Sequence, residues 1–255
     1  MVDLDAASVA FLVGASVVAG AVNAVAGGGS LISFPALLAI GYPSLTANAT
    51  NILGVLPGYL GGSVGYRREL RGQGRRSAAL GATSAVGALV GAVLLLVAPA
   101  AAFEAIAPFL VLLACGALAA QPLVERRARR SAGERAEHRS LALQALVFLA
   151  AVYGGYFGAA LGIMLLAVLA AGLPDDLQRV NALKGLLSLV IGLVSAIYLA
   201  LLGPVAFAAA AVMAGGSLVG GRAGVSVARR LPAGPLRWLV VLYGVAVAVV
   251  LLVTG

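Results

Sequence analysis

The sequence predicts an all-α integral membrane protein, a polytopic helical bundle built from two inverted repeats. Three observations predict it: an apolar composition, basic loops between the apolar segments, and motifs that recur in the same order in both halves of the chain. Of the 255 residues, 62% are hydrophobic and 10% are charged, whereas soluble domains average about 25% charged residues. This composition also excludes a disordered chain. At about 20 apolar residues per spanning helix, the chain has room for about eight to ten membrane elements.

The basic residues indicate which loops face the cytoplasm. The net charge is +8, and the arginines gather in three short stretches, 67–76, 126–139 and 222–237. Short basic loops between apolar segments are typical of the cytoplasmic side of a membrane protein, and they argue against a nucleic-acid partner. The first apolar segment follows Asp3 and Asp5 rather than basic residues, so we expect it to be retained instead of cleaved as a signal peptide.

Apolar segments follow one another along the whole chain. In the first half they cover 8–26, 30–42, 45–65, 77–98 and 102–122, and in the second half 141–157, 158–173, 179–202, 204–221 and 236–254. Each half is thus a broken-helix hairpin of two short segments followed by three spanning helices, and this odd number of elements places the second half upside down. The predicted division is a first transmembrane repeat over 1–122, a basic cytoplasmic linker over 123–140 and a second transmembrane repeat over 141–255.

The second half repeats motifs of the first. Residues 40–43 match residues 171–174, and Gly27 precedes Pro43 by 16 positions, as Gly158 precedes Pro174. Two further matches are 48–51 with 181–184, where the second turn is two residues longer, and 86–91 with 215–220. Four matches in the same order indicate a duplication. An inverted repeat with a glycine-interrupted segment in each half is typical of secondary transporters, whose substrate sites form at such breaks.

The glycine breaks are the first candidate binding elements. Gly27, Gly28, Gly29 and Ser30 open a short helix within the apolar region. Backbone N–H groups at a helix N-terminus favour an anion, and glycine lets a ligand approach the backbone closely. The alternative is that these glycines serve only close helix packing, which is common in membranes. In the second half, the corresponding candidates are at Gly158 and Gly162.

Lys184 is the second candidate. It is the only lysine of the chain and lies several residues into an apolar span, where an ionisable group is costly unless it is paired or faces water. We interpret it as a substrate-binding residue, and the alternative is that its long side chain reaches the interface.

The remaining polar residues indicate the charge of the substrate. No carboxylate lies deep in a predicted span, and a cation transporter normally needs one, so the sequence favours an anionic substrate. Neutral side chains that could bind its oxygens are Asn23, Ser30, Asn48, Thr50, Asn51, Asn181 and Ser188; interhelical hydrogen bonding is the alternative role for each. Cys115 and His138 lie apart from any metal-ligand cluster, and we expect no metal and no cofactor.

Two parts of the chain resemble a known family. The first runs from Asn23 to Arg68, with the glycine break, Pro35, a Gly-Tyr-Pro turn and an Asn-Ala-Thr span, and the second is the repeat after Tyr153 together with residues 216–232. Both parts resemble the sulfite exporter TauE/SafE family of membrane permeases. The resemblance implies a multi-pass permease of the bacterial inner membrane for small anions, including sulfite and organosulfonates.

The predicted function is that of a secondary transporter that moves a small anion by alternating access. Its expected partners are the anion and the lipid bilayer, and the small-residue spacings are equally consistent with contacts within one chain and with a homo-oligomer. We expect no enzymatic activity and no catalytic residues, and no P-loop indicates ATP drive. Two alternatives remain open: an intramembrane enzyme that uses a dyad of Ser30 and Lys184, and a membrane scaffold without transport activity.

Overall fold

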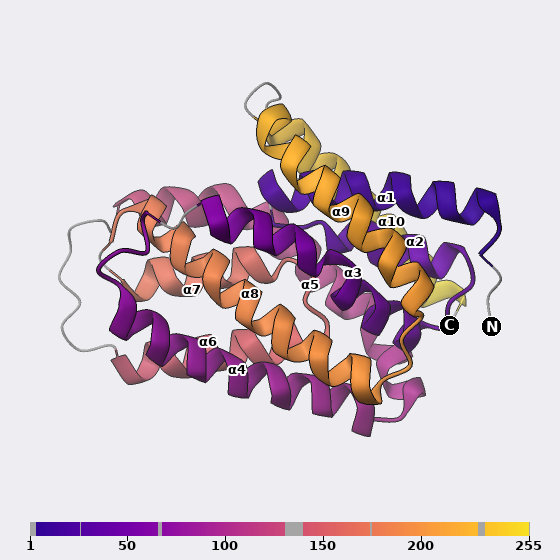
Figure 1. Ribbon diagram of the computed structural model, residues 1–255, viewed down its shortest axis with the longest axis horizontal. Coiled ribbons are helices and arrows are strands. Elements are labelled where there is room, and N and C mark those ends of the chain that lie inside the picture. The colour runs from indigo at the N-terminus through magenta and orange to yellow at the C-terminus, as the bar shows by residue number, and fades with distance from the viewer. Residues whose placement is uncertain are drawn as a thin grey trace.

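The computed structural model describes residues 4–25, 27–65, 68–130, 140–173, 175–228 and 233–254, and these residues form ten helices and no strand. The helices are α1 (Ala6–Val25), α2 (Ser30–Ala39), α3 (Ser44–Gly65), α4 (Gly74–Val97), α5 (Ala100–Arg130), α6 (Ser140–Tyr156), α7 (Leu161–Gly172), α8 (Leu177–Leu202), α9 (Phe207–Ala228) and α10 (Ala233–Thr254). Figure 1 shows them as one elongated bundle. The prediction of an all-helical protein is confirmed.

Within the described residues, four helices contain an apolar segment long enough to cross a membrane: Ala6–Asn23, Gly74–Val97, Ala100–Arg127 and Leu177–Leu202. Large apolar side chains also cover the outside of the bundle, and Val97 and Val253 are 76% and 81% exposed. Apolar surface of this kind is unfavourable in water and is favourably solvated by lipid tails. The chain is therefore a polytopic helical membrane protein, as predicted.

Several helix ends differ from the sequence prediction, and three of these differences involve a proline or a glycine. α5 continues through Pro122 to Arg130, because neighbouring helices and local adjustments can compensate for a missing backbone N–H in a membrane protein. α7 begins at Leu161 rather than directly at Gly158, and α9 begins at Phe207 rather than at Pro204. The later starts leave Gly158 and Pro204 in the turns before these helices, where their backbone restrictions fit.

The two halves have equivalent helices. The break between α1 and α2, from Val25 to Ser30, is as long as the break between α6 and α7, from Tyr156 to Leu161. The starts of α3, α4 and α5 at 44, 74 and 100 have the same intervals as the starts of α8, α9 and α10 at 177, 207 and 233. Between these two sets, the starts of α7 and α8 are two residues further apart than those of α2 and α3, as the motif comparison predicts. The extra residues lie in α7, which has 12 residues against 10 in α2, and not in the turn, because the turns before α3 and α8 are equally long.

One of the four motif matches is wrong by one helical turn. The match of 86–91 with 215–220 pairs Gly87 with Gly216, whereas the starts of α4 and α9 pair Gly87 with Gly220. A Cβ added at Gly87 would lie 2.7 Å from the Phe148 carbonyl oxygen, and one added at Gly220 would lie 2.0 Å from that of Val17. These are equivalent contacts in the two halves. Small residues repeat every four positions in both helices, so a shift of one turn gives an almost equally good match.

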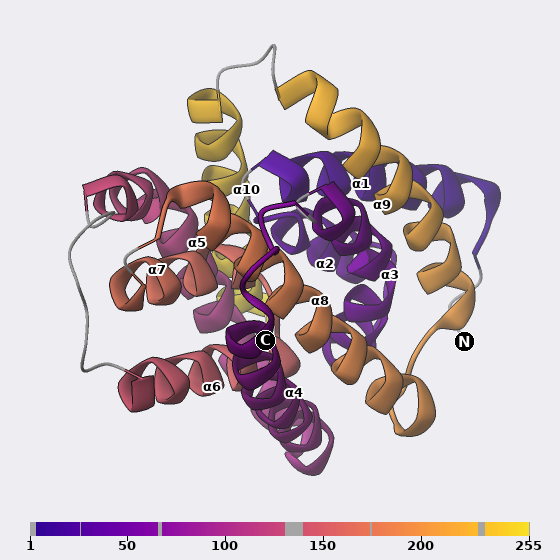
Figure 2. The same ribbon diagram turned by 60° about the vertical axis from the view of Figure 1, so that its left-hand side comes forward.

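The halves interlock rather than lie beside each other as separate units. α1 packs along α9, and its equivalent α6 packs along α4 (Figures 1 and 2). α3 meets α8 in the middle of the bundle, and α5 meets α10. The first helix of each hairpin is thus covered by the fourth helix of the other half. An upside-down orientation of one half relative to the other stays a prediction.

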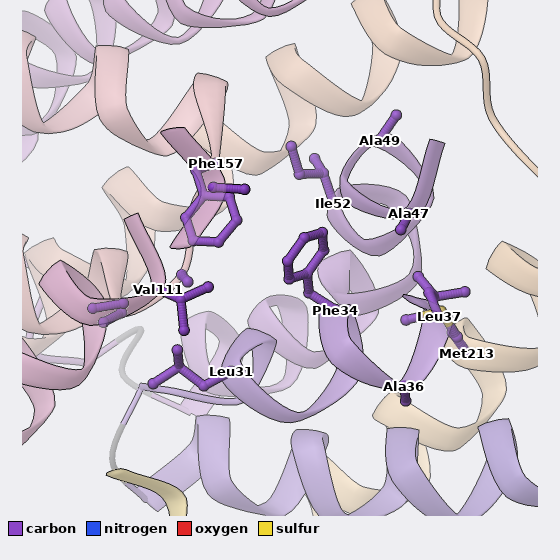
Figure 3. Packing of buried hydrophobic residues seen from close by; sticks show 14 of the residues in the cluster. Leu31, Phe34, Ala36, Leu37, Ala47, Ala49, Ile52, Val111, Phe157 and Met213 are labelled. Atoms are coloured by element: carbon purple, nitrogen blue, oxygen red, sulfur yellow. The ribbon is translucent and has the colours of Figure 1, made fainter. Parts of the chain in front are cut away.

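Aromatic side chains join the halves in the core. The rings of Phe34 on α2 and Phe157, next to the break after α6, lie 5.3 Å apart in an edge-to-face arrangement. Figure 3 shows these two rings facing each other, with Val111 of α5 and Leu31 nearby. Both phenylalanines are at most 1% exposed. The contact holds the short helix of the first half close to the break of the second.

Candidate functional site

The two glycine breaks meet at the interface between the halves. Gly27 and Gly158, which the motif spacing pairs, have backbone φ angles of +76° and +78°. Residues other than glycine rarely adopt this conformation. A Cβ added at Gly27 would lie 3.7 Å from the Gly162 Cα, and one added at Gly162 would lie 3.8 Å from the Gly27 Cα. The backbone at Gly27 therefore lies close to the first turn of α7, with room for a methyl group between them.

Lys184 stands beside this meeting point. Its Cδ is 3.9 Å from the position that a Cβ would occupy at Gly162, and its side chain is half-buried. Within the described part of the chain it forms no hydrogen bond and no ion pair. Glu125 on α5 is near enough to interact electrostatically with Lys184, but it forms no ion pair and no hydrogen bond with it. The charge of Lys184 thus remains available to a ligand.

Both short helices begin without a side-chain cap. At the start of α2 the N-cap residue is Gly29, and at the start of α7 it is Ala160; no side chain caps either helix by a hydrogen bond. The amides of Leu31 and Ile32 in α2 and of Leu161 and Ile163 in α7 donate to carbonyls of the preceding turn. The amides of Ser30 and Gly162 form no such bond in the described residues, so these two N–H groups are the donors that the helix starts offer to an anion. Ser30, the first residue of α2, is 5% exposed.

Ala160 is a residue that sequence reasoning missed. Its φ of +57° makes it the one non-glycine residue with a positive φ in the described ranges. Such a conformation costs of order 1–2 kcal/mol for an L-residue, and strained residues of this kind cluster at functional sites. Nothing in the identity of an alanine signals this conformation, because its neighbours in the fold impose it.

The other glycines of the first break have packing roles. A Cβ added at Gly29 would lie 2.2 Å from the carbonyl oxygen of Ala19 on α1, and one added at Gly28 would lie 3.1 Å from Cδ2 of Leu118 on α5. The helix-packing alternative therefore describes Gly29 well, whereas the close approach to the second break belongs to Gly27.

Several of the polar candidates already bond to other helices. Asn48 Nδ2 donates to the Tyr156 carbonyl at 2.8 Å, Thr50 Oγ1 accepts from the Ala206 amide at 3.0 Å, and Asn51 Oδ1 accepts from the Ser33 hydroxyl at 2.6 Å. Asn23 lies within hydrogen-bonding reach of the Tyr59 hydroxyl. For these four residues the interhelical alternative fits the structure.

Ser188 differs from them. It is 2% exposed, and its hydroxyl has no hydrogen-bond partner in the described residues. Asn181, Lys184 and Ser188 have spacings of three and four on α8, which place them on one face of that helix. A buried hydroxyl without a partner is unfavourable, so this face has an unused donor next to the lysine.

Tyr153 is a further residue that the sequence analysis did not select. Its hydroxyl donates to the Ala159 carbonyl at 2.7 Å and so bridges the second break from α6. In the sequence, the only sign of this role is that a tyrosine lies about one turn before a glycine break. That position does not predict which carbonyl its hydroxyl bonds to.

The features described above are those of a multi-pass membrane protein with two equivalent sets of helices and a glycine break in each, and the comparisons with known proteins place it among membrane transporters. The chain belongs to the sulfite exporter TauE/SafE family, whose sequence profile matches residues 12–251.

A curated relative gives a second comparison. The chain is 36% identical over 112 residues to a protein of Sinorhizobium sp. named "Probable membrane transporter protein ORF9". The match covers 44% of this chain and 43% of that protein. No solved structure gives a significant match.

Proposed function

We propose that the chain is a secondary transporter that moves a small anion, such as sulfite or an organosulfonate, across the bacterial inner membrane by alternating access. The observation that carries the proposal is the unpaired Lys184 beside the facing backbones of Gly27 and Gly162. A positive charge without an ion pair in the described residues, next to two helix starts without side-chain caps, is an electrostatic arrangement for an anion.

Each group has a defined role in this proposal. The ammonium group of Lys184 attracts the anion and neutralises its charge, and hydrogen bonds to ionic groups contribute about 1.5–3 kcal/mol. The Ser188 hydroxyl, which lacks a partner in the described residues, donates to one of the anion's oxygens. The amides of Ser30 and Gly162, which form no backbone hydrogen bond in the described residues, donate to the others, and the glycines let the oxygens approach.

The interlocked packing supports alternating access. The proposed site lies between the two halves, and the glycine breaks of both contribute to it. If one half is inverted relative to the other, a rocking motion between halves can expose the same site first to one side of the membrane and then to the other.

The enzyme alternative is not proposed, because Ser30 and Lys184 form no hydrogen bond with each other in the described residues. No observation on the described part of the chain favours the scaffold alternative.

The proposal is tested by thermal stability of the purified protein in detergent against sulfite, methanesulfonate, phosphate and chloride, followed by flux of the best ligand in proteoliposomes. A ligand that binds the folded state raises the melting temperature. We expect sulfite or methanesulfonate to raise the melting temperature selectively. Lys184→Met should lower the apparent affinity for this ligand by about 10- to 100-fold, because it removes one charge-assisted hydrogen bond.

Two variants control this experiment. Lys184→Arg keeps the charge and should retain part of the binding. Arg75→Gln removes a positive charge from an exposed residue and should leave binding unchanged. Equal binding and flux in the wild type and Lys184→Met would remove Lys184 from the site.

A further inference from the structure

We propose that Arg76 and Arg179 form a second, outer binding site for the transported anion, and that the Asp175 carboxylate fills this site while no anion is bound. The inference rests on the proposed function, since it names a further station on the same route. Arg76 forms an ion pair with Oδ2 of Asp175, and Arg179 Nε lies 3.6 Å from Oδ1. One carboxylate thus lies between two guanidinium groups.

The carboxylate has the chemistry of the proposed ligand. Guanidinium groups bind carboxylates and other oxyanions through the same N–H donors. A sulfonate or sulfite offers the same negatively charged oxygens as the Asp175 side chain. An anion that arrives from solution therefore competes with Asp175 for both arginines.

One of the two arginines is held in place independently of Asp175. Arg76 donates to Oε1 of Gln73 at 2.5 Å, and Gln73, which is 2% exposed, donates in turn to the carbonyl of Glu69 at 2.8 Å. Arg76 thus keeps its orientation when Asp175 moves away. Preformed positioning of this kind lowers the cost of binding.

The second arginine has an unused donor. Arg179 Nε is buried and forms no hydrogen bond in the described residues, because Asp175 Oδ1 at 3.6 Å is too far for one. A ligand that moves closer than this carboxylate oxygen would satisfy the donor. The Asp175 side chain is therefore an incomplete ligand for the site.

The location suits a station that precedes the central site. Arg76 belongs to α4 of the first half, whereas Asp175 and Arg179 lie at the start of α8 in the second half. Arg179 is five residues before Lys184, or about 7.5 Å along the helix at 1.5 Å per residue. Asp175 is 23% exposed and the arginine side chains are 30% and 37% exposed. Water solvates such pairs and weakens them, so an anion can displace Asp175.

The experiment measures charge-selective access to a cysteine placed between the two stations. Asn181→Cys is introduced with Cys115→Ala, which removes the one native cysteine. The probes are the anionic 2-sulfonatoethyl and the cationic trimethylammonioethyl methanethiosulfonates, and the readout is the ratio of their modification rates. Asp175→Asn should raise the anion-to-cation ratio at least fivefold, because it removes the competing carboxylate.

Matched controls separate the site from general charge effects. Asp176→Asn removes a charge one residue away and keeps a good N-cap for α8, so the ratio should stay within twofold. Arg76→Gln should lower the ratio, whereas the exposed Arg75→Gln should not. The arginine variants keep the proposal testable if Asp175→Asn fails to fold.

Two outcomes overturn the proposal: equal ratios in Asp175→Asn and Asp176→Asn, or an unchanged ratio in Arg76→Gln. The labelling readout is independent of flux. If the modification-rate ratios change as expected but the wild type shows no anion flux, the proposed transport is refuted and the outer anion site is supported. Flux that depends on Lys184 with unchanged ratios would refute the outer site alone.

Discussion

Asn51 and Lys184 occupy equivalent positions in the two halves, because each lies equally far from the start of its helix, Ser44 for α3 and Leu177 for α8. Asn51 is 1% exposed, and its Oδ1 accepts a hydrogen bond from Ser33 at 2.6 Å. Lys184 keeps an unpaired charge in the described residues. The same place in the fold therefore holds a neutral, hydrogen-bonded side chain in one half and a charged side chain without an ion pair in the other. In the proposed site the two halves thus have unequal roles.

The bond between Ser33 and Asn51 should stabilise the fold without contributing to transport. Ser33→Ala leaves a buried Asn51 Oδ1 without a donor, and we expect a loss of about 0.6–1.7 kcal/mol, the range measured for polar contacts between membrane helices. Unfolding measurements on the single variants and on Ser33→Ala with Asn51→Ala would give the coupling energy. Anion flux per folded molecule should stay close to that of the wild type. A strong loss of flux at unchanged stability would instead place Asn51 in the binding site.

Alanine substitutions should separate the glycines by function. Gly29→Ala places a Cβ 2.2 Å from a backbone carbonyl oxygen and should prevent correct packing of α1 on the break. Gly27→Ala has space around the Cβ but a φ of +76°, so we expect a destabilisation of about 1–2 kcal/mol with the fold retained. Gly14→Ala is the matched control, because nothing lies within 4 Å of its Cβ position. Yield of monodisperse protein and melting temperature report the three results, and equal effects of Gly27→Ala and Gly29→Ala would contradict the assignment.

Asp5 should make the first turn of α1 sensitive to acid. Its Oδ1 accepts from the Ser8 amide at 2.8 Å, and the hydrogen bonds from Ser8 hold the pKa of this carboxyl below its usual value of 3.8. A lowered pKa in the folded state stabilises the helix start above the unfolded pKa, and the effect is lost as the pH falls through the folded pKa. The protection factor of the N-terminal peptide against hydrogen exchange, which corrects for the intrinsic pH dependence of exchange, should therefore fall below about pH 4. Asp5→Asn, which keeps a capping side chain, should abolish this pH dependence.

Much of the architecture could be predicted because it depends on local composition. Apolar segments and the glycines at 27 and 158 identify the helices and the breaks between them. The register of α4 against α9 could not be predicted, because glycines such as Gly87 and Gly91 repeat at one-turn spacing and fit a neighbouring register almost as well. The end of α5 is a similar case, since Pro122 predicts an end to the span but packing lets the helix continue.

The candidate site could be predicted in part for a similar reason. Lys184 is notable in the sequence because a charge in an apolar span is costly, and the structure places it beside both breaks. The ion pairs of Asp175 with Arg76 and Arg179 could not be predicted as a set, since Arg76 and Asp175 are far apart in the sequence and meet only through the tertiary fold. Whether Asn48 and Thr50 bond to other helices likewise depends on distant backbone atoms.

The interlocking of the halves also has a consequence for how the protein is made. Gly20 of α1 fits against the Ser217 carbonyl of α9, where an added Cβ would lie 2.4 Å from that oxygen. During synthesis α1 leaves the ribosome long before α9 exists, so its small-residue groove must face lipid, or another helix, until the second half has been inserted. Newly inserted chains of intermediate length are therefore obligatory assembly intermediates, and the final partner of the first helix is among the last segments to reach the bilayer.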